Sequence, residues 1–77
     1  MQKQFKTKDF YEASACIASK QKLACLEKDG NFYWFVFEDC DGCLKISDLF
    51  WRNELKVLAK DYADAIRSLK DRLFARA

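Results

Sequence analysis

Short apolar runs and helix-like apolar stripes alternate along this chain. Residues 23–28 and 31–37 are rich in apolar side chains and flank Asp29-Gly30. Asp-Gly between two such runs is a signature of a β-hairpin with a two-residue turn. We therefore predict a hairpin here, in a register that places Leu26 opposite Tyr33.

Both faces of this hairpin are apolar, because successive side chains of a strand point to opposite sides. One face carries Ala24, Leu26, Tyr33, Phe35 and Phe37. The other face carries Leu23, Cys25, Phe32, Trp34 and Val36. If helices cover both faces, Trp34 is a core residue. Otherwise the second face is an exposed apolar patch of the kind that marks interfaces.

Helical spacing of apolar residues predicts three helices. The first is expected from Lys8 to about Ser19, with Thr7 as its cap and its stripe on one side of the helix. The second is expected over about 40–52, capped within the polar segment 38–42 and ended by Asn53. The third, over about 59–75, has the clearest stripe: Tyr62, Ala65, Ile66, Leu69 and Leu73.

These elements predict a single α+β domain over residues 1–77, in which an antiparallel hairpin packs with two to three helices. Short strands near Phe5 and Val57 are candidates to extend the hairpin. The composition agrees with a folded domain: 51% of the residues are hydrophobic and 16% aromatic, with no proline and only two glycines. A chain so poor in linker residues and so rich in apolar ones is not typical of disorder.

The charge balance and the absence of an export signal favour a cytoplasmic protein. Fourteen Lys and Arg face twelve Asp and Glu, which is not the balance of a general polyanion binder. No stretch approaches the roughly 20 apolar residues of a membrane helix, and the N-terminal residues do not resemble a signal peptide. The four cysteines are therefore expected to be reduced thiols, and the expected location is the cytoplasm, with no membrane contact.

Residue types that enzymes use are missing. Histidine is absent, so Ser-His and Cys-His pairs are impossible, and Gly30 and Gly42 cannot make a glycine-rich phosphate loop. We predict no enzyme activity, no catalytic residue and no cofactor.

Cys40-Asp41-Gly42-Cys43 is the one motif that suggests metal or redox chemistry. A zinc site would need the fold to bring Cys16 and Cys25 to the same place. Asp39 and Asp41 would oppose a reactive thiolate at this position. A thiol or zinc site at Cys40 and Cys43 is kept as a minor alternative, and packing of Cys43 at a helix start is preferred.

Four short segments carry a resemblance to a known family: residues 5–10, 35–39, 50–51 and 62–70, with the sequences FKTKDF, FVFED, FW and YADAIRSLK. They resemble an uncharacterised family of small bacterial and phage domains of unknown function, which open with an F-x-T-x-D-[FL] pattern. The resemblance implies a bacterial or phage source and supplies no activity. Cys40 and Cys43 are not part of the family pattern.

Two functions remain open. The first is a small non-catalytic protein-interaction module, self-associating as a homodimer or binding an unknown protein through the face of Leu23, Cys25, Phe32, Trp34 and Val36. The second is a single-stranded nucleic-acid binder, in which bases stack on the same aromatics. Its phosphate contacts would come from rim lysines: Lys3, Lys6, Lys20, Lys22 and Lys28.

Overall fold

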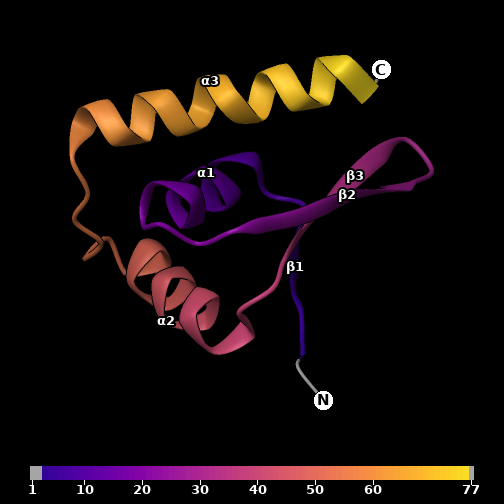
Figure 1. The fold of residues 1–77 in the computed structure, drawn as a ribbon. Coiled ribbons are helices and arrows are strands. Elements are labelled where there is room, and N and C mark those ends of the chain that lie inside the picture. The colour runs from indigo at the N-terminus through magenta and orange to yellow at the C-terminus, as the bar shows by residue number, and fades with distance from the viewer. Residues whose placement is uncertain (1–2, 77) are drawn as a thin grey trace.

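Three strands and three helices make up the fold, which the computed structural model describes over residues 3–76 (Figure 1). Their order is β1 (Phe5–Thr7), α1 (Phe10–Ala18), β2 (Leu23–Asp29), β3 (Phe32–Phe37), α2 (Cys40–Trp51) and α3 (Ala59–Arg76). The hairpin of β2 and β3 extends away from α1 and α2 in Figure 1. The predicted α+β fold is confirmed. Among these residues, no helix is both long enough and apolar enough to cross a membrane.

The sheet is antiparallel and has the order β1-β3-β2. The predicted strand at Phe5 is β1, which pairs with β3 so that Phe5 lies opposite Phe37. The predicted strand near Val57 is wrong. Residues 53–58 form an irregular connection in which Leu55 packs against the core and Val57 is half-buried. Leu55 and Val57 therefore anchor a loop by their side chains, and the backbone there does not pair with the sheet.

The register of the hairpin differs from the prediction by two residues. Leu26 lies opposite Phe35 instead of Tyr33, and Asp29 lies opposite Phe32, so Gly30 and Asn31 form the turn. Gly30 has a φ of 62°, whereas Asn31 has no positive φ. A positive φ at only the first turn residue matches a type II′ turn, which favours glycine there. Aspartate would be poorly suited to that position, which explains the shift.

A β-bulge moves one residue of β2 to the other face. Leu23 pairs with Phe37 and Cys25 pairs with Val36, so Ala24 is the extra residue between them. Such a bulge breaks the alternation of side chains. Leu23 consequently packs against the core, and Ala24 is exposed.

Helix α1 is buried on almost every side, although the pattern predicted a one-sided stripe. Its small residues Ala13, Ala15 and Cys16 are completely inaccessible to solvent. Small side chains let neighbouring elements approach closely, and α1 packs against both α2 and α3. The predicted Thr7 cap is wrong by two residues. Asp9 is the N-cap, and its carboxylate accepts a hydrogen bond of 2.8 Å from the amide of Glu12.

Helices α2 and α3 follow the predicted limits. Asp39 caps α2 by accepting a hydrogen bond of 3.0 Å from the amide of Gly42. Asn53 ends α2 with a φ of 61°, and Glu54 donates its amide to the carbonyl of Leu49, as in a Schellman motif. In α3 the predicted stripe faces inward, with Ala65 and Leu69 buried.

The helices pack against one face of the sheet. The core combines sheet residues Phe5, Leu26, Phe35 and Phe37 with helix residues that include Cys16, Cys43, Ile46 and Leu69. The Cα trace measures 32 × 32 × 18 Å, and the short dimension is thin for a sheet with helices on both sides. The opposite face of the sheet is therefore the place to look for a functional surface.

Candidate interaction surface

The second face of the sheet lies outside the core cluster. The strand register places the following residues on it: Lys6, Cys25, Glu27, Asp29, Phe32, Trp34 and Val36. None of these seven residues belongs to the cluster in which helices and sheet meet. Of the two arrangements that the sequence left open, the structure has the one in which helices cover a single face.

An aromatic pair and a lysine form the centre of the exposed part of this face. The rings of Phe32 and Trp34 meet edge to face, with centroids 5.5 Å apart. The Nζ atom of Lys8 lies 4.9 Å from the Phe32 centroid and 5.8 Å from the Trp34 centroid. A cation at these distances is attracted by the ring quadrupoles. We call Lys8, Phe32 and Trp34 the aromatic patch.

A hydrogen bond also holds the aromatic patch in place. The indole nitrogen of Trp34 donates a hydrogen bond of 3.1 Å to Oδ2 of Asp29. This bond satisfies the only polar atom of the Trp34 side chain and leaves its ring for apolar contact. Phe32 remains 37% exposed, and Lys8 is also exposed. The patch is thus ordered by its own contacts and still accessible.

An ion pair covers the other end of the face. Lys6 on β1 and Glu27 on β2 are joined at 3.1 Å. Their partners on the central strand β3 are Val36 and Trp34, so the ion pair crosses β3. Val36 is completely buried. This end of the face therefore presents a neutralised charged pair, and the exposed aromatic rings lie toward the turn.

The structure keeps part of the predicted interaction face and corrects the rest. Cys25, Phe32 and Trp34 lie on it and are partly accessible. Leu23 does not, because the bulge turns it to the core, and Val36 lies on the face but is covered. Lys8 was missed because the sequence placed it in the first turn of a helix. The helix begins two residues later, and Lys8 lies in the connection from β1.

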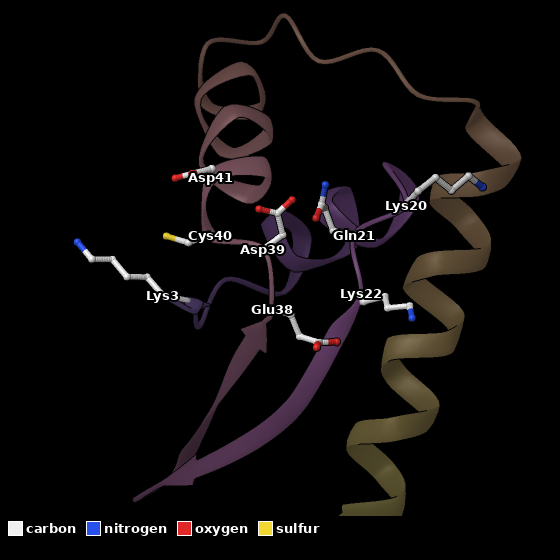
Figure 2. Close-up of a pocket in the computed structure, with 8 residues that line it drawn as sticks. All are labelled: Lys3, Lys20, Gln21, Lys22, Glu38, Asp39, Cys40 and Asp41. Carbon is white, nitrogen blue, oxygen red and sulfur yellow. The ribbon is translucent and has the colours of Figure 1, made fainter. Parts of the chain in front are cut away.

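The lysines expected around this face are not gathered there. Lys6 is paired with Glu27, and Lys28 lies opposite Tyr33, which packs on the core side. Lys3, Lys20 and Lys22 line a separate open hollow with Gln21, Glu38, Asp39, Cys40 and Asp41 (Figure 2). Figure 2 shows Lys3 and Lys20 pointing to opposite sides of the hollow. Basic and acidic groups balance in this hollow, and it offers no concentrated positive charge.

The four cysteines are not gathered in one place within residues 3–76. Cys16 and Cys43 are buried in the core and hydrogen-bonded to each other, while Cys25 and Cys40 are half-buried elsewhere. In the part of the chain that is described, no three Cys, His, Asp or Glu side chains are placed to hold a metal ion. Burial raises the pKa of the Cys43 thiol to about 11, and the charge of Asp39 adds to the rise, although a hydrogen bond with Cys16 opposes it. The thiol is therefore protonated at neutral pH and poorly suited to redox chemistry.

Glu12 is a buried carboxylate that the sequence pattern did not reveal. It is 6% exposed and lies on α1 between the other elements. It accepts hydrogen bonds from the Thr7 hydroxyl at 2.5 Å, from the indole nitrogen of Trp51 at 2.8 Å, and from the hydroxyl of Ser47. Three neutral donors satisfy this anion and join β1, α1 and α2. The sequence around Glu12 does not indicate this, since two of the donors, Ser47 and Trp51, are distant in the chain.

Comparison with protein-family models, with curated proteins and with solved structures finds no match to this chain. The resemblance to small bacterial and phage domains stays a prediction.

Proposed function

We propose that this chain is a non-catalytic module that binds another protein through the aromatic patch of Lys8, Phe32 and Trp34. The observation that supports this most is an ordered aromatic pair, with a lysine over both rings, on the face of the sheet opposite the helices. Aromatic residues that are restrained before binding lose little entropy when a partner arrives. The proposal places the module in the cytoplasm, where its four free cysteines would stay reduced.

The chemistry of the patch indicates what the partner presents. The ring edges of Phe32 and Trp34 favour an apolar side chain. Lys8 makes no ion pair within residues 3–76, so its charge favours a carboxylate next to that apolar group. The expected ligand is therefore a protein segment with an aliphatic or aromatic residue beside Asp or Glu.

Nucleic acid is the less favoured ligand of the same face. The Lys8 ammonium already lies against the rings on which bases would stack. Glu27 and Asp29 add negative charge to the face, and all five lysines expected to contact phosphates lie away from it or are paired. A polyanion would meet nearly balanced charge there.

A library of random peptides displayed on phage tests the proposal directly. The folded chain is the bait, and counter-selection uses Phe32→Ser, which removes the exposed ring near the turn. Enriched peptides should pair an apolar residue with an acidic one and bind Phe32→Ser and Lys8→Glu at least tenfold more weakly. Phe74→Ser is the matched control, since Phe74 is 72% exposed on α3 and lies outside the patch.

Two results would contradict this function. Peptides that bind Phe32→Ser as tightly as the parent chain would show that the patch is not the binding surface. Tight binding of an oligothymidine strand, weakened steeply by salt and by Lys8→Glu, would support the nucleic-acid alternative instead.

A further inference from the structure

Helix α2 exposes two large apolar residues beside the side that packs on the core. Leu44 is 52% exposed and Trp51 is 59% exposed. Cys40 and Ser47 lie on the same side of α2 and are half-buried, because Cys40 packs against the core and Ser47 donates to Glu12. These four positions follow the spacing i, i+4, i+7 and i+11, which places them on one side of a helix. The neighbouring side of α2 holds Cys43 and Ile46 in the core. We call Leu44 and Trp51 the outer stripe.

Trp51 is the most prominent residue of the outer stripe, and it is held in one orientation. Its indole nitrogen donates to Oε2 of the buried Glu12 at 2.8 Å. Its ring also meets that of Phe50 edge to face, with centroids 5.0 Å apart. The polar atom of the indole is therefore satisfied inside the protein, and the exposed remainder is apolar. An exposed aromatic restrained in this way is a typical anchor of protein interfaces.

A row of four exposed charges runs beside the outer stripe. Asp41, Lys45, Asp48 and Arg52 follow one another at helical spacing on the side away from the core. Their signs are negative, positive, negative and positive. Read in the opposite direction, the signs are reversed at every position. The row is therefore complementary to an antiparallel copy of itself.

The apolar residues fit the same symmetry. In an antiparallel pair of α2 helices, a register that places Asp41 opposite Arg52 of a second copy also places Lys45 opposite Asp48. Leu44 lies opposite Trp51 of the second copy when one helix slides by two residues, which is about 3 Å along the axis. Long side chains such as Lys and Arg span this difference. A two-fold axis across α2 thus places opposite charges across from each other and brings the two outer stripes together. Within its own chain, Arg52 also pairs with Asp48 at 3.0 Å and with Glu54 at 3.2 Å.

We propose that two copies of this chain associate through the outer stripe of α2, with the helices antiparallel and Leu44 of each copy against Trp51 of the other. The sequence predicted self-association through the hairpin face. The exposed apolar residues and the charge pattern favour α2 for this role. The proposal does not depend on the aromatic patch, which lies on the sheet.

Sedimentation of the reduced chain over a wide concentration range tests the association. A dimer is expected to form as the concentration rises. Leu44→Glu places a charge in the stripe and should leave a monomer whose circular dichroism is unchanged. Phe32→Ser should leave the dimer intact. A monomer at all concentrations would overturn the proposal, and so would a dimer that Phe32→Ser dissociates and Leu44→Glu does not.

Charge reversal tests the antiparallel arrangement. Lys45→Glu or Asp48→Lys alone should weaken the dimer about tenfold, because each changes two symmetry-related contacts between copies. The double variant Lys45→Glu, Asp48→Lys restores opposite signs across the axis and should recover most of the affinity. If the double variant is weaker than both single variants, the two residues do not face each other and the proposed pairing is wrong.

Discussion

The buried carboxylate of Glu12 accepts a hydrogen bond of 2.8 Å from the indole nitrogen of Trp51, which lies 39 residues further along the chain. The hydroxyls of Thr7 and Ser47 donate to the same carboxylate. One anionic group therefore connects β1, α1 and α2, and it also orients an exposed tryptophan. Stability and the proposed dimer surface depend on the same contact.

Replacement of Glu12 should destabilise the folded chain even when the shape of the side chain is kept. Glu12→Gln replaces one acceptor oxygen by an amide donor and leaves buried donors poorly satisfied, so we expect the free energy of unfolding to fall by about 1–3 kcal/mol. Urea denaturation measures the change. Glu27→Gln is the control, because it disrupts only an exposed ion pair worth about 0–1 kcal/mol. Equal losses in the two variants would show that Glu12 is not a structural centre.

Lys20 should be a site of easy stabilisation. It follows α1 with a φ of 73°, in the left-handed region that costs a residue with a Cβ atom about 1–2 kcal/mol. Lys20→Gly is expected to raise the free energy of unfolding by about 1 kcal/mol. Lys20→Ala also removes the 3.7 Å contact with Asp61 but keeps the Cβ atom, so it should give no gain. Thermal or urea unfolding of both variants separates backbone strain from lost charge.

The four thiols should fall into two classes. Cys25 and Cys40 are half-buried, whereas Cys16 and Cys43 are completely inaccessible. A maleimide added to the folded chain is expected to modify Cys25 and Cys40 first, and Cys16 and Cys43 only after denaturant is added. Mass spectrometry of proteolytic peptides identifies the sites. Modification of Cys43 as fast as that of Cys40 would contradict the packing of the core.

Stability should decline at alkaline pH. Burial raises the pKa of Cys16, of Cys43 to about 11, and of Tyr62, above the ordinary values of 9.0 for the thiols and 10.0 for the phenol. The unfolded chain then releases protons that the folded chain keeps, so stability falls as pH rises. The contribution of Cys43 is complete below about pH 9 and is lost as the pH passes 11.

Urea denaturation at a series of pH values from neutral to 11 measures this decline. The double variant Cys16→Ala, Cys43→Ala removes both buried thiols and should flatten the curve between pH 9 and 11. A curve with the same slope in this variant would show that other groups cause the alkaline loss.

The sequence predicted those elements whose signals are local. The α+β class, the hairpin, the strand at Phe5 and the limits of α2 and α3 all follow from periodicity, Asp39 and Asn53. Two errors arose where neighbouring signals compete. Thr7 and Asp9 are both good caps, and only tertiary packing selects Asp9. Gly30 suits either position of a two-residue turn, and the choice shifts the register by two residues.

The candidate surfaces were harder to predict, because they depend on contacts between distant residues. The bulge at Ala24 decides that Leu23 is a core residue, and nothing in the β2 sequence marks a bulge. Glu12 looks like an exposed residue of a helix until Ser47 and Trp51 are brought to it. The outer stripe of α2 looked like part of a broad core face, because a single sequence does not show how much of a helix its neighbouring elements cover.

The position of α1 determines when its packing can form during synthesis. This helix leaves the ribosome before α2 and α3, yet Ala13 and Cys16 are shielded only when α2 and α3 pack beside it. Strand β1 must also wait for β3 before it gains a hydrogen-bonded neighbour. The nascent chain therefore exposes its most apolar helix until α3 has also emerged, and the time between these two events is when the protein is most vulnerable to aggregation.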